Sequence, residues 1–155
     1  FDDYSMNGRT YRYFKGDPLY PFGYGLSYAR FGYAGLRVQP VGGKPENGLR
    51  VEAVVRNTSA RTGDEVVQLY ITPPALDGAP RHALRGAQHV TLKAGEARTV
   101  RFELVPRDLS FVDAAGARRL MPGRYRLSVG SGQPGGDATT LCATYDVRAD
   151  VHLPE

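Results

Sequence analysis

The sequence lacks tryptophan, has a single cysteine, and contains no run of about 18 apolar residues, the length that a membrane-spanning helix needs. An internal disulfide needs two cysteines, so Cys142 cannot form one, and we expect it to be an ordinary small residue of a strand. The short apolar runs predict no membrane-embedded segment. Stretches free of glycine and proline are also scarce, because 19 glycines and 11 prolines interrupt 155 residues, which argues against a helical bundle.

Positive charge is spread along the chain and is not gathered in one block. Twenty lysines and arginines against 16 acidic residues give a net charge of +4. Arginines such as Arg50, Arg101 and Arg126 alternate with apolar residues, as the solvent-facing positions of strands do. Nucleic-acid-binding domains instead concentrate basic residues on one face, so we predict no nucleic-acid partner. The first residue is Phe1, which leads us to expect a mature or excised segment of a longer protein.

Apolar and polar residues alternate in five segments, a pattern typical of half-buried strands. These segments are 49–56, 67–72, 100–104, 124–129 and 141–148. Weaker patterns predict strands at 33–39, with a bulge at Gly35, and at 85–92. Turn residues separate the segments, and we expect loops at 73–84 and 106–122. We therefore predict an all-β fold: an antiparallel β-sandwich of the immunoglobulin or fibronectin type III-like kind, with about seven strands, over residues 31–155.

Tyr125 stands at the start of a late strand, directly after Pro122-Gly123-Arg124. Sandwiches of this kind often place a tyrosine there whose hydroxyl bonds to the backbone a few residues upstream, an arrangement called a tyrosine corner. Two readings stay open at this point, a tyrosine corner and an ordinary core tyrosine.

Aromatic residues are concentrated at the start of the chain. Eleven of the 16 tyrosines and phenylalanines fall in residues 1–33, where glycine and proline recur, so we predict an extended aromatic-rich N-terminal arm over residues 1–30. At roughly 150 Å² for each buried ring, eleven rings represent on the order of 1,500 Å², whereas a monomer seldom exposes an apolar patch beyond about 600 Å². The arm therefore wraps its own sandwich, docks on a partner domain, or offers its tyrosines to sugar rings.

Few residues suggest a catalytic, metal or cofactor site. Asp2-Asp3 and Asp64-Glu65 are neighbouring carboxylates, but sequence neighbours in a strand point to opposite faces, so we expect turn-capping and solvent roles for Asp64 and Glu65. Asp108 is expected to organise a turn. No cysteine or histidine partner stands at metal-ligand spacing from any of the three histidines, His82, His89 and His152. We predict no catalytic, metal or cofactor site in this chain.

Seven ordered motifs resemble those of one known family. They are 8–14 (GRTYRYF), 18–28 (PLYPFGYGLSY), 63–70 (GDEVVQLY), 84–86 (LRG), 92–96 (LKAGE), 106–111 (PRDLSF) and 122–125 (PGRY). The first two resemble the segment that leads into the C-terminal domain of glycoside hydrolase family 3 enzymes, and the others resemble that domain. The resemblance implies a fibronectin type III-like domain of a retaining β-glucosidase or β-xylosidase, whose chemistry is carried by an upstream barrel and a second α/β domain.

The same resemblance leads to the functional expectation. The chain is expected to be a non-catalytic accessory domain that packs on the upstream catalytic domains of the same polypeptide, which act on a β-linked glucoside or xyloside in a periplasmic or secreted protein. The main contacts are expected to come from six arm residues, Tyr11, Tyr13, Phe14, Tyr20, Phe22 and Tyr24. Self-association of the isolated chain through this apolar strip is also expected. The rivals are an independent carbohydrate-binding or cell-surface module and a self-contained hydrolase.

Overall fold

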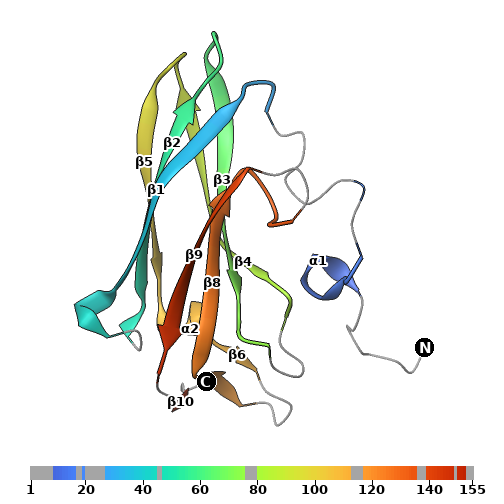
Figure 1. Cartoon of the computed structure of the whole chain (residues 1–155), viewed down its shortest axis with the longest axis vertical. Coiled ribbons are helices and arrows are strands. Elements are labelled where there is room, and N and C mark those ends of the chain that lie inside the picture. The colour runs from blue at the N-terminus through green and yellow to red at the C-terminus, as the bar shows by residue number, and fades with distance from the viewer. Residues whose placement is uncertain are drawn as a thin grey trace.

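Seven long strands form two antiparallel sheets that pack face to face (Figure 1). The computed structural model describes residues 9–16, 19, 27–44, 47–75, 80–112, 117–135, 139–148 and 150–152. One sheet has the order β1-β2-β5, with β1 at Phe31–Pro40, β2 at Leu49–Asn57 and β5 at Ala97–Leu104. The other has the order β4-β3-β8-β9, with β3 at Gly63–Thr72, β4 at Ala83–Leu92, β8 at Gly123–Gly130 and β9 at Thr140–Val147. The prediction of an all-β, fibronectin type III-like sandwich is confirmed.

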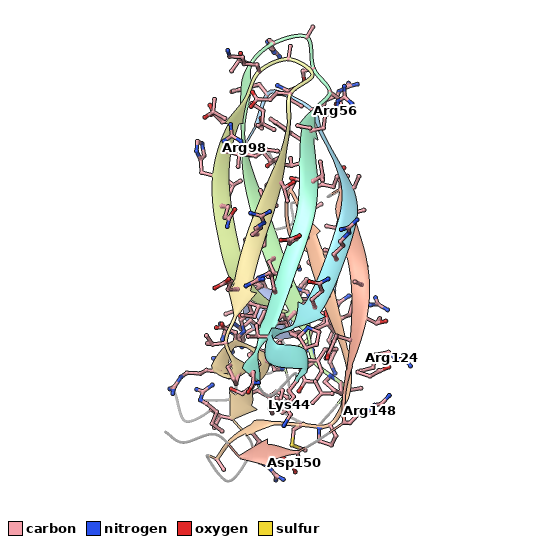
Figure 2. The ribbon with its side chains drawn as sticks, turned by 90° about the vertical axis from the view of Figure 1, so that its left-hand side faces the viewer. Lys44, Arg56, Arg98, Arg124, Arg148 and Asp150 are labelled. Atoms are coloured by element: carbon pink, nitrogen blue, oxygen red, sulfur yellow. The ribbon has the colours of Figure 1, made fainter. Side chains whose placement is uncertain are left out.

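The core lies between the two sheets and is built by the period-two alternation of the strands. On β2, every second residue from Leu49 to Asn57 is buried, and on β5 the buried residues are Val100, Phe102 and Leu104. Because side chains alternate across a strand, the residues between them reach solvent. Figure 2 shows this outer face of the β1-β2-β5 sheet, where charged side chains such as Arg56 and Arg98 project from the ribbon.

The predicted bulge at Gly35 is present in β1. The pairing of β1 with β2 shifts register between Ala34 and Arg37, so that β1 carries one extra residue there. Gly35 has a φ of +64°, a left-handed conformation that glycine adopts without steric cost. The bulge lets Phe31 near the start of the strand and the half-buried Val38 near its end both pack against the same core.

The segment predicted as a loop over 106–122 contains short regular elements. A single helical turn, α2 at Pro106–Leu109, is followed by β6 at Phe111–Val112 and β7 at Arg118–Leu120. These strands form a small sheet of order β10-β7-β6 with β10 at Val151–His152. Strands of two or three residues are too short to show alternation, so no pattern in the sequence predicted them. The Asp108 side chain accepts a hydrogen bond from the Val105 N–H (2.9 Å), as expected of a turn-organising residue.

The outer face of the β4-β3-β8-β9 sheet departs from simple alternation. Gln68 and Tyr70 occupy the positions of β3 that should face solvent, yet both are buried. The short helix α1, at Thr10–Tyr13, lies over this face on the side away from the β1-β2-β5 sheet (Figure 1). The remaining helical turn, η1, covers Val41–Gly43. Among the described residues no helix has the length and apolar character needed to cross a membrane.

Candidate functional site

The predicted interface residues of the arm divide into two groups. Tyr11, Tyr13 and Phe14 belong to or directly follow α1, while Tyr20, Phe22 and Tyr24 lie outside the described residues. Tyr11 and Tyr13 are half-buried and Phe14 is 44% exposed. The helical turn thus presents apolar surface both toward the sandwich and away from it.

Tyr11 packs on the sandwich through two rings. Its ring meets Tyr70 edge-on at a centroid distance of 6.4 Å and stacks on His82 at 6.1 Å. Tyr70 and His82 also contact each other edge-on at 5.9 Å. Aromatic pairs of this geometry stabilise a fold by more than the burial of their surface alone contributes. Tyr11 therefore shows that part of the arm covers its own sandwich, one of the three readings left open by the sequence.

Backbone hydrogen bonds tie the arm to the segment that leads into β4. The Arg81 N–H donates to the Arg12 carbonyl at 2.7 Å, and the Arg81 side chain donates to the Phe14 carbonyl at 3.1 Å. The Leu84 N–H reaches the Tyr11 hydroxyl at 3.4 Å. These bonds fix α1 over the start of β4, about 70 residues later in the sequence.

His82 is the most unusual polar residue beneath the arm. It is 3% exposed, and its Nε2 atom has no hydrogen-bond partner among the described residues. Burial, followed by the positive charge of Arg81, lowers the pKa of His82, while the Tyr11 backbone acts in the opposite direction. A neutral imidazole is therefore favoured at this position.

Four arginines lie on the docked arm or close to Arg85, and sequence reasoning missed this group. We call these residues the arginine cluster: Arg12 on α1, Arg81 before β4, Arg85 on β4 and Arg118 on β7. Burial and then Arg12 lower the pKa of Arg85, and Arg118 adds to this effect, while Asp108 opposes it. The four residues come from three distant segments, so no sequence pattern joins them.

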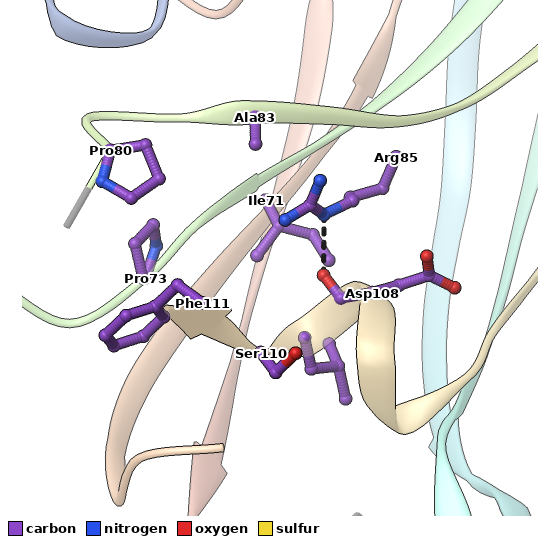
Figure 3. Close-up of a pocket in the computed structure, with 9 residues that line it drawn as sticks. Ile71, Pro73, Pro80, Ala83, Arg85, Asp108, Ser110 and Phe111 are labelled. Carbon is purple, nitrogen blue, oxygen red and sulfur yellow. Dashed lines mark hydrogen bonds between the residues drawn. The ribbon is translucent and has the colours of Figure 1, made fainter. Parts of the chain in front are cut away.

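A shallow notch lies beside Arg85, between β4 and α2 (Figure 3). Arg85 crosses it and donates a hydrogen bond from Nε to the backbone carbonyl of Asp108 at 2.6 Å, while the Asp108 carboxylate points away from the guanidinium group. Pro73, Pro80 and Phe111 form its apolar wall. The notch leaves about 10 Å³ for the centres of water molecules. That is room for about one water and too little for a sugar ring.

A larger hollow lies at the opposite end of the sandwich. It encloses about 290 Å³ and is lined by Ser27, Tyr28, Ala29 and the 61–64 segment. Tyr28 is 96% exposed, and its carbonyl accepts a hydrogen bond from the Arg61 side chain at 3.1 Å. An exposed aromatic ring beside polar groups is the kind of surface on which a sugar can stack.

The neighbouring carboxylates identified in the sequence lie in different structural surroundings. Asp64 is exposed and accepts a hydrogen bond from the Thr91 hydroxyl at 2.5 Å, within a strand and not in a turn. The expectation that Glu65 faces solvent is wrong, because it is 5% exposed and points into the core side of β3. The side-chain alternation that exposes Asp64 is what buries Glu65. Asp2 and Asp3 lie outside the described residues.

Glu65 shares its buried position with Tyr33 of β1. One Glu65 carboxylate oxygen accepts a hydrogen bond from the Val66 N–H at 2.8 Å. The Tyr33 hydroxyl lies near this carboxylate but makes no hydrogen bond of ordinary geometry within the part of the chain that the structure describes. Burial raises the pKa of Glu65, and burial together with the Glu65 charge raises the pKa of Tyr33. The pair is an internal polar contact between the two sheets.

Comparison with known proteins finds relatives of this chain among β-xylosidases and β-glucosidases. The family described as fibronectin type III-like domain matches residues 65–133. A xylan 1,4-β-xylosidase of Xylanibacter ruminicola is 38% identical over 146 residues, which cover 93% of this chain and 16% of that protein. A probable β-glucosidase G of Aspergillus flavus is 38% identical over 144 residues, covering 77% of this chain and 18% of that protein. The chain thus spans less than a fifth of the length of these two relatives.

Solved structures show the same similarity in three dimensions. β-Glucosidase 3B of Thermotoga neapolitana superposes with a TM-score of 0.78 at 30% identity, covering 90% of this chain and 19% of that protein. The GH3 β-glucosidase of Bifidobacterium adolescentis superposes with a TM-score of 0.73 at 34% identity, covering 83% of this chain and 18% of that protein. The chain therefore belongs to the fibronectin type III-like domains of the type found in GH3 β-glucosidases and β-xylosidases.

Proposed function

We propose that this chain is a non-catalytic accessory domain of a retaining β-glucosidase or β-xylosidase, and that it packs on the catalytic domains and stabilises them. The observation that carries the proposal is the coverage of its relatives. Between 77% and 93% of the chain matches proteins of which it represents only 16–20%. In such a protein the remaining four-fifths or more would hold the barrel and the α/β domain that perform hydrolysis.

The positions of the carboxylates support this proposal. Retaining hydrolysis uses two carboxyl groups about 5 to 5.5 Å apart on either side of the glycosidic bond. Asp64 reaches solvent, whereas its neighbour Glu65 is buried between the sheets. Asp108 lies near the start of β4, while Asp64 pairs with Thr91 near its end. These three carboxylates therefore cannot flank one sugar.

The test compares the parent enzyme with and without residues 31–155, and with the 155-residue chain alone, on aryl β-glucosides and aryl β-xylosides. We expect no turnover by the chain alone, and a lower melting temperature for the enzyme that lacks residues 31–155. Hydrolysis by the chain alone that survives purification and is lost in Asp64→Asn or Asp108→Asn would show that the chain is itself a hydrolase.

A second candidate function, carbohydrate binding, rests on the exposed Tyr28 beside the 290 Å³ hollow. Arg61, Thr62 and Asp64 would supply hydrogen bonds to a sugar that stacks on the ring. Titration of the chain with xylan and β-glucan oligosaccharides tests it, with Tyr28→Ala as the variant and Val105→Ala, another exposed apolar residue, as the control. Binding that Tyr28→Ala abolishes and Val105→Ala preserves would support this candidate. Absence of binding by all three proteins would dismiss it.

A further inference from the structure

The arginine cluster, defined above as Arg12, Arg81, Arg85 and Arg118, carries positive charge that no carboxylate of the described residues neutralises through a salt bridge. Among the described residues none of the four guanidinium groups forms a salt bridge. Their hydrogen bonds go to uncharged oxygens, namely the Tyr11 hydroxyl, the Phe14 carbonyl, the Asp108 carbonyl and the Ser110 hydroxyl. Asp108 is the one carboxylate among the groups that act on Arg85, and it bonds the Val105 N–H.

Several arginines elsewhere on the described surface pair with acidic residues on neighbouring strands. Arg101 bonds Glu52 at 2.8 Å, and Arg50 bonds Glu103 at 3.3 Å across the β2-β5 pair. Arg124 bonds Asp146 at 3.0 Å, across β8 and β9. Like charges placed together repel one another, and this repulsion grows when they are partly withdrawn from water, as Arg85 is. An external anion bound at the arginine cluster would therefore lower the free energy of these neighbouring charges.

Exposed apolar groups lie next to these charges. Phe14 is 44% exposed, and its carbonyl is held by Arg81. Val112 is 49% exposed and pairs with Arg118 in the small sheet. Apolar groups beside unpaired arginines form a surface suited to a protein partner, because arginine and aromatic residues dominate the binding energy of protein interfaces.

We propose that the arginine cluster, together with Phe14 and Val112, is the surface through which this domain binds an acidic patch of the catalytic domains that precede it. The inference rests on the proposed accessory function and adds to it the face that docks and the chemistry of the partner. Aspartate or glutamate side chains of the partner accept hydrogen bonds from Arg12, Arg81 and Arg85, which match carboxylate geometry. Such pairs set orientation as well as affinity.

The course of the chain supports the preceding domains as the partner of this surface. Arg9 and α1 lie on the same face as the arginine cluster, since Arg12 is both part of α1 and bonded to Arg81. Eight residues precede Arg9 in the sequence, and eight residues span at most about 28 Å when fully extended. Any domain joined to Phe1 is therefore tethered near this face, which raises its effective concentration there.

Lysine substitution combined with zero-length cross-linking tests the proposal in the full-length parent enzyme. Arg12→Lys, Arg81→Lys and Arg85→Lys keep the positive charge and supply a primary amine that a carbodiimide joins to a contacting carboxylate. The matched control is Arg56→Lys, an exposed residue on the opposite sheet (Figure 2). We expect peptides that link residue 12, 81 or 85 to an aspartate or glutamate outside the 155 residues, and none from residue 56.

The cross-linking results distinguish a wrong docking face from the absence of docking. Links to upstream carboxylates from residue 56, with none from residues 12, 81 and 85, would overturn the proposed face but leave an accessory domain that docks. Absence of links from all four positions, with hydrogen exchange over 81–85 equally fast in the chain alone and in the full enzyme, would overturn both proposals.

Charge reversal provides a second measurement. In the full enzyme, Arg12→Glu and Arg81→Glu should speed amide exchange over 81–85 at least tenfold, whereas Arg56→Glu should leave it unchanged. In the chain alone, where no partner is present, Arg12→Glu should change that exchange by less than threefold, and Arg81→Glu, which also removes the bond to the Phe14 carbonyl, should accelerate it less than in the full enzyme. Equal acceleration in both settings would mean that these arginines act within their own domain, and the docking surface would be rejected.

Discussion

The Tyr125 hydroxyl donates a hydrogen bond to the Met121 backbone carbonyl at 3.0 Å, while its ring is fully buried in the core. The bond spans the turn at Pro122 that leads into β8, so it fastens the entry of a central strand to the sandwich. Burial is the main reason that the pKa of Tyr125 rises to about 12, with a smaller contribution from Asp150 and an opposing one from the Met121 carbonyl. The hydroxyl therefore stays protonated and remains a donor.

Tyr125→Phe should lower the free energy of unfolding by about 1 kcal/mol, because it removes this hydrogen bond and keeps the ring. Urea denaturation measures the change. The control is Tyr145→Phe, on the partner position of β9, whose hydroxyl bonds no described residue. A loss at Tyr125 no larger than that at Tyr145 would show that the bond to Met121 contributes nothing.

Phe102→Ala should cost about 3 to 5 kcal/mol, since it removes a buried ring and leaves a cavity between the sheets. Arg101→Ala should cost less than about 1 kcal/mol, because Arg101 lies on the solvent face of β5 and its ion pair with Glu52 is largely exposed. Chemical denaturation of both variants tests the alternation of β5. Similar losses at the two positions would contradict it.

Gly86→Ala should destabilise the domain by about 1 to 3 kcal/mol through overpacking. A Cβ at this position of β4 would lie 2.6 Å from Cδ1 of Phe102. The shorter side chain of Phe102→Leu should relieve part of the cost, so the double variant should lose less than the sum of the single variants. Gly32→Ala is the control, because its Cβ would meet Thr58 at an ordinary 3.5 Å. Strict additivity in thermal denaturation would argue against the Gly86–Phe102 contact.

Glu65→Gln should alter how stability depends on pH. Burial raises the pKa of Glu65 in the folded chain, so its protonated form favours folding, and this contribution is lost as pH rises from about 4.3, the ordinary value, through the raised pKa. Wild-type stability should therefore fall in that range by an amount that Glu65→Gln does not show. Urea denaturation from pH 4 to pH 8 measures the difference, and parallel curves for the two proteins would refute the role assigned to Glu65.

The contribution of His82 to the pH dependence of stability should have the opposite sign. Burial lowers its pKa in the folded chain, so the neutral form favours folding, and this contribution is lost as pH falls below about 6.5, the ordinary value, toward the lowered pKa. The arm should then loosen, and the Arg81 amide, which bonds the Arg12 carbonyl, should exchange faster at pH 5.5 after correction for the intrinsic rate. His82→Phe should remove this acid sensitivity. Equal acid sensitivity in wild type and His82→Phe would exclude His82 as its source.

The alternation of apolar and polar residues was sufficient to predict the sandwich. It placed the core faces of β2 and β5 correctly, from Leu49 to Val55 and from Val100 to Leu104. The sequence also predicted the Gly35 bulge, and of the two readings left open for Tyr125 the structure shows the tyrosine corner. These features depend on neighbours within a few residues, or on a strand facing one continuous core, so the chain itself contains the information.

Only the tertiary structure shows which segments cover the outer face of the β4-β3-β8-β9 sheet. Alternation assigns Gln68 and Tyr70 to solvent, but α1 and His82 fold over Tyr70, and Gln68 bonds the Ser131 carbonyl. The arginine cluster likewise forms only when residues 12, 81, 85 and 118 meet. Contacts between segments 30 to 100 residues apart leave no local period in the sequence, because each segment satisfies its own backbone pattern whichever partner covers its side chains. Their electrostatic and packing energies therefore appear only once the fold has brought them together.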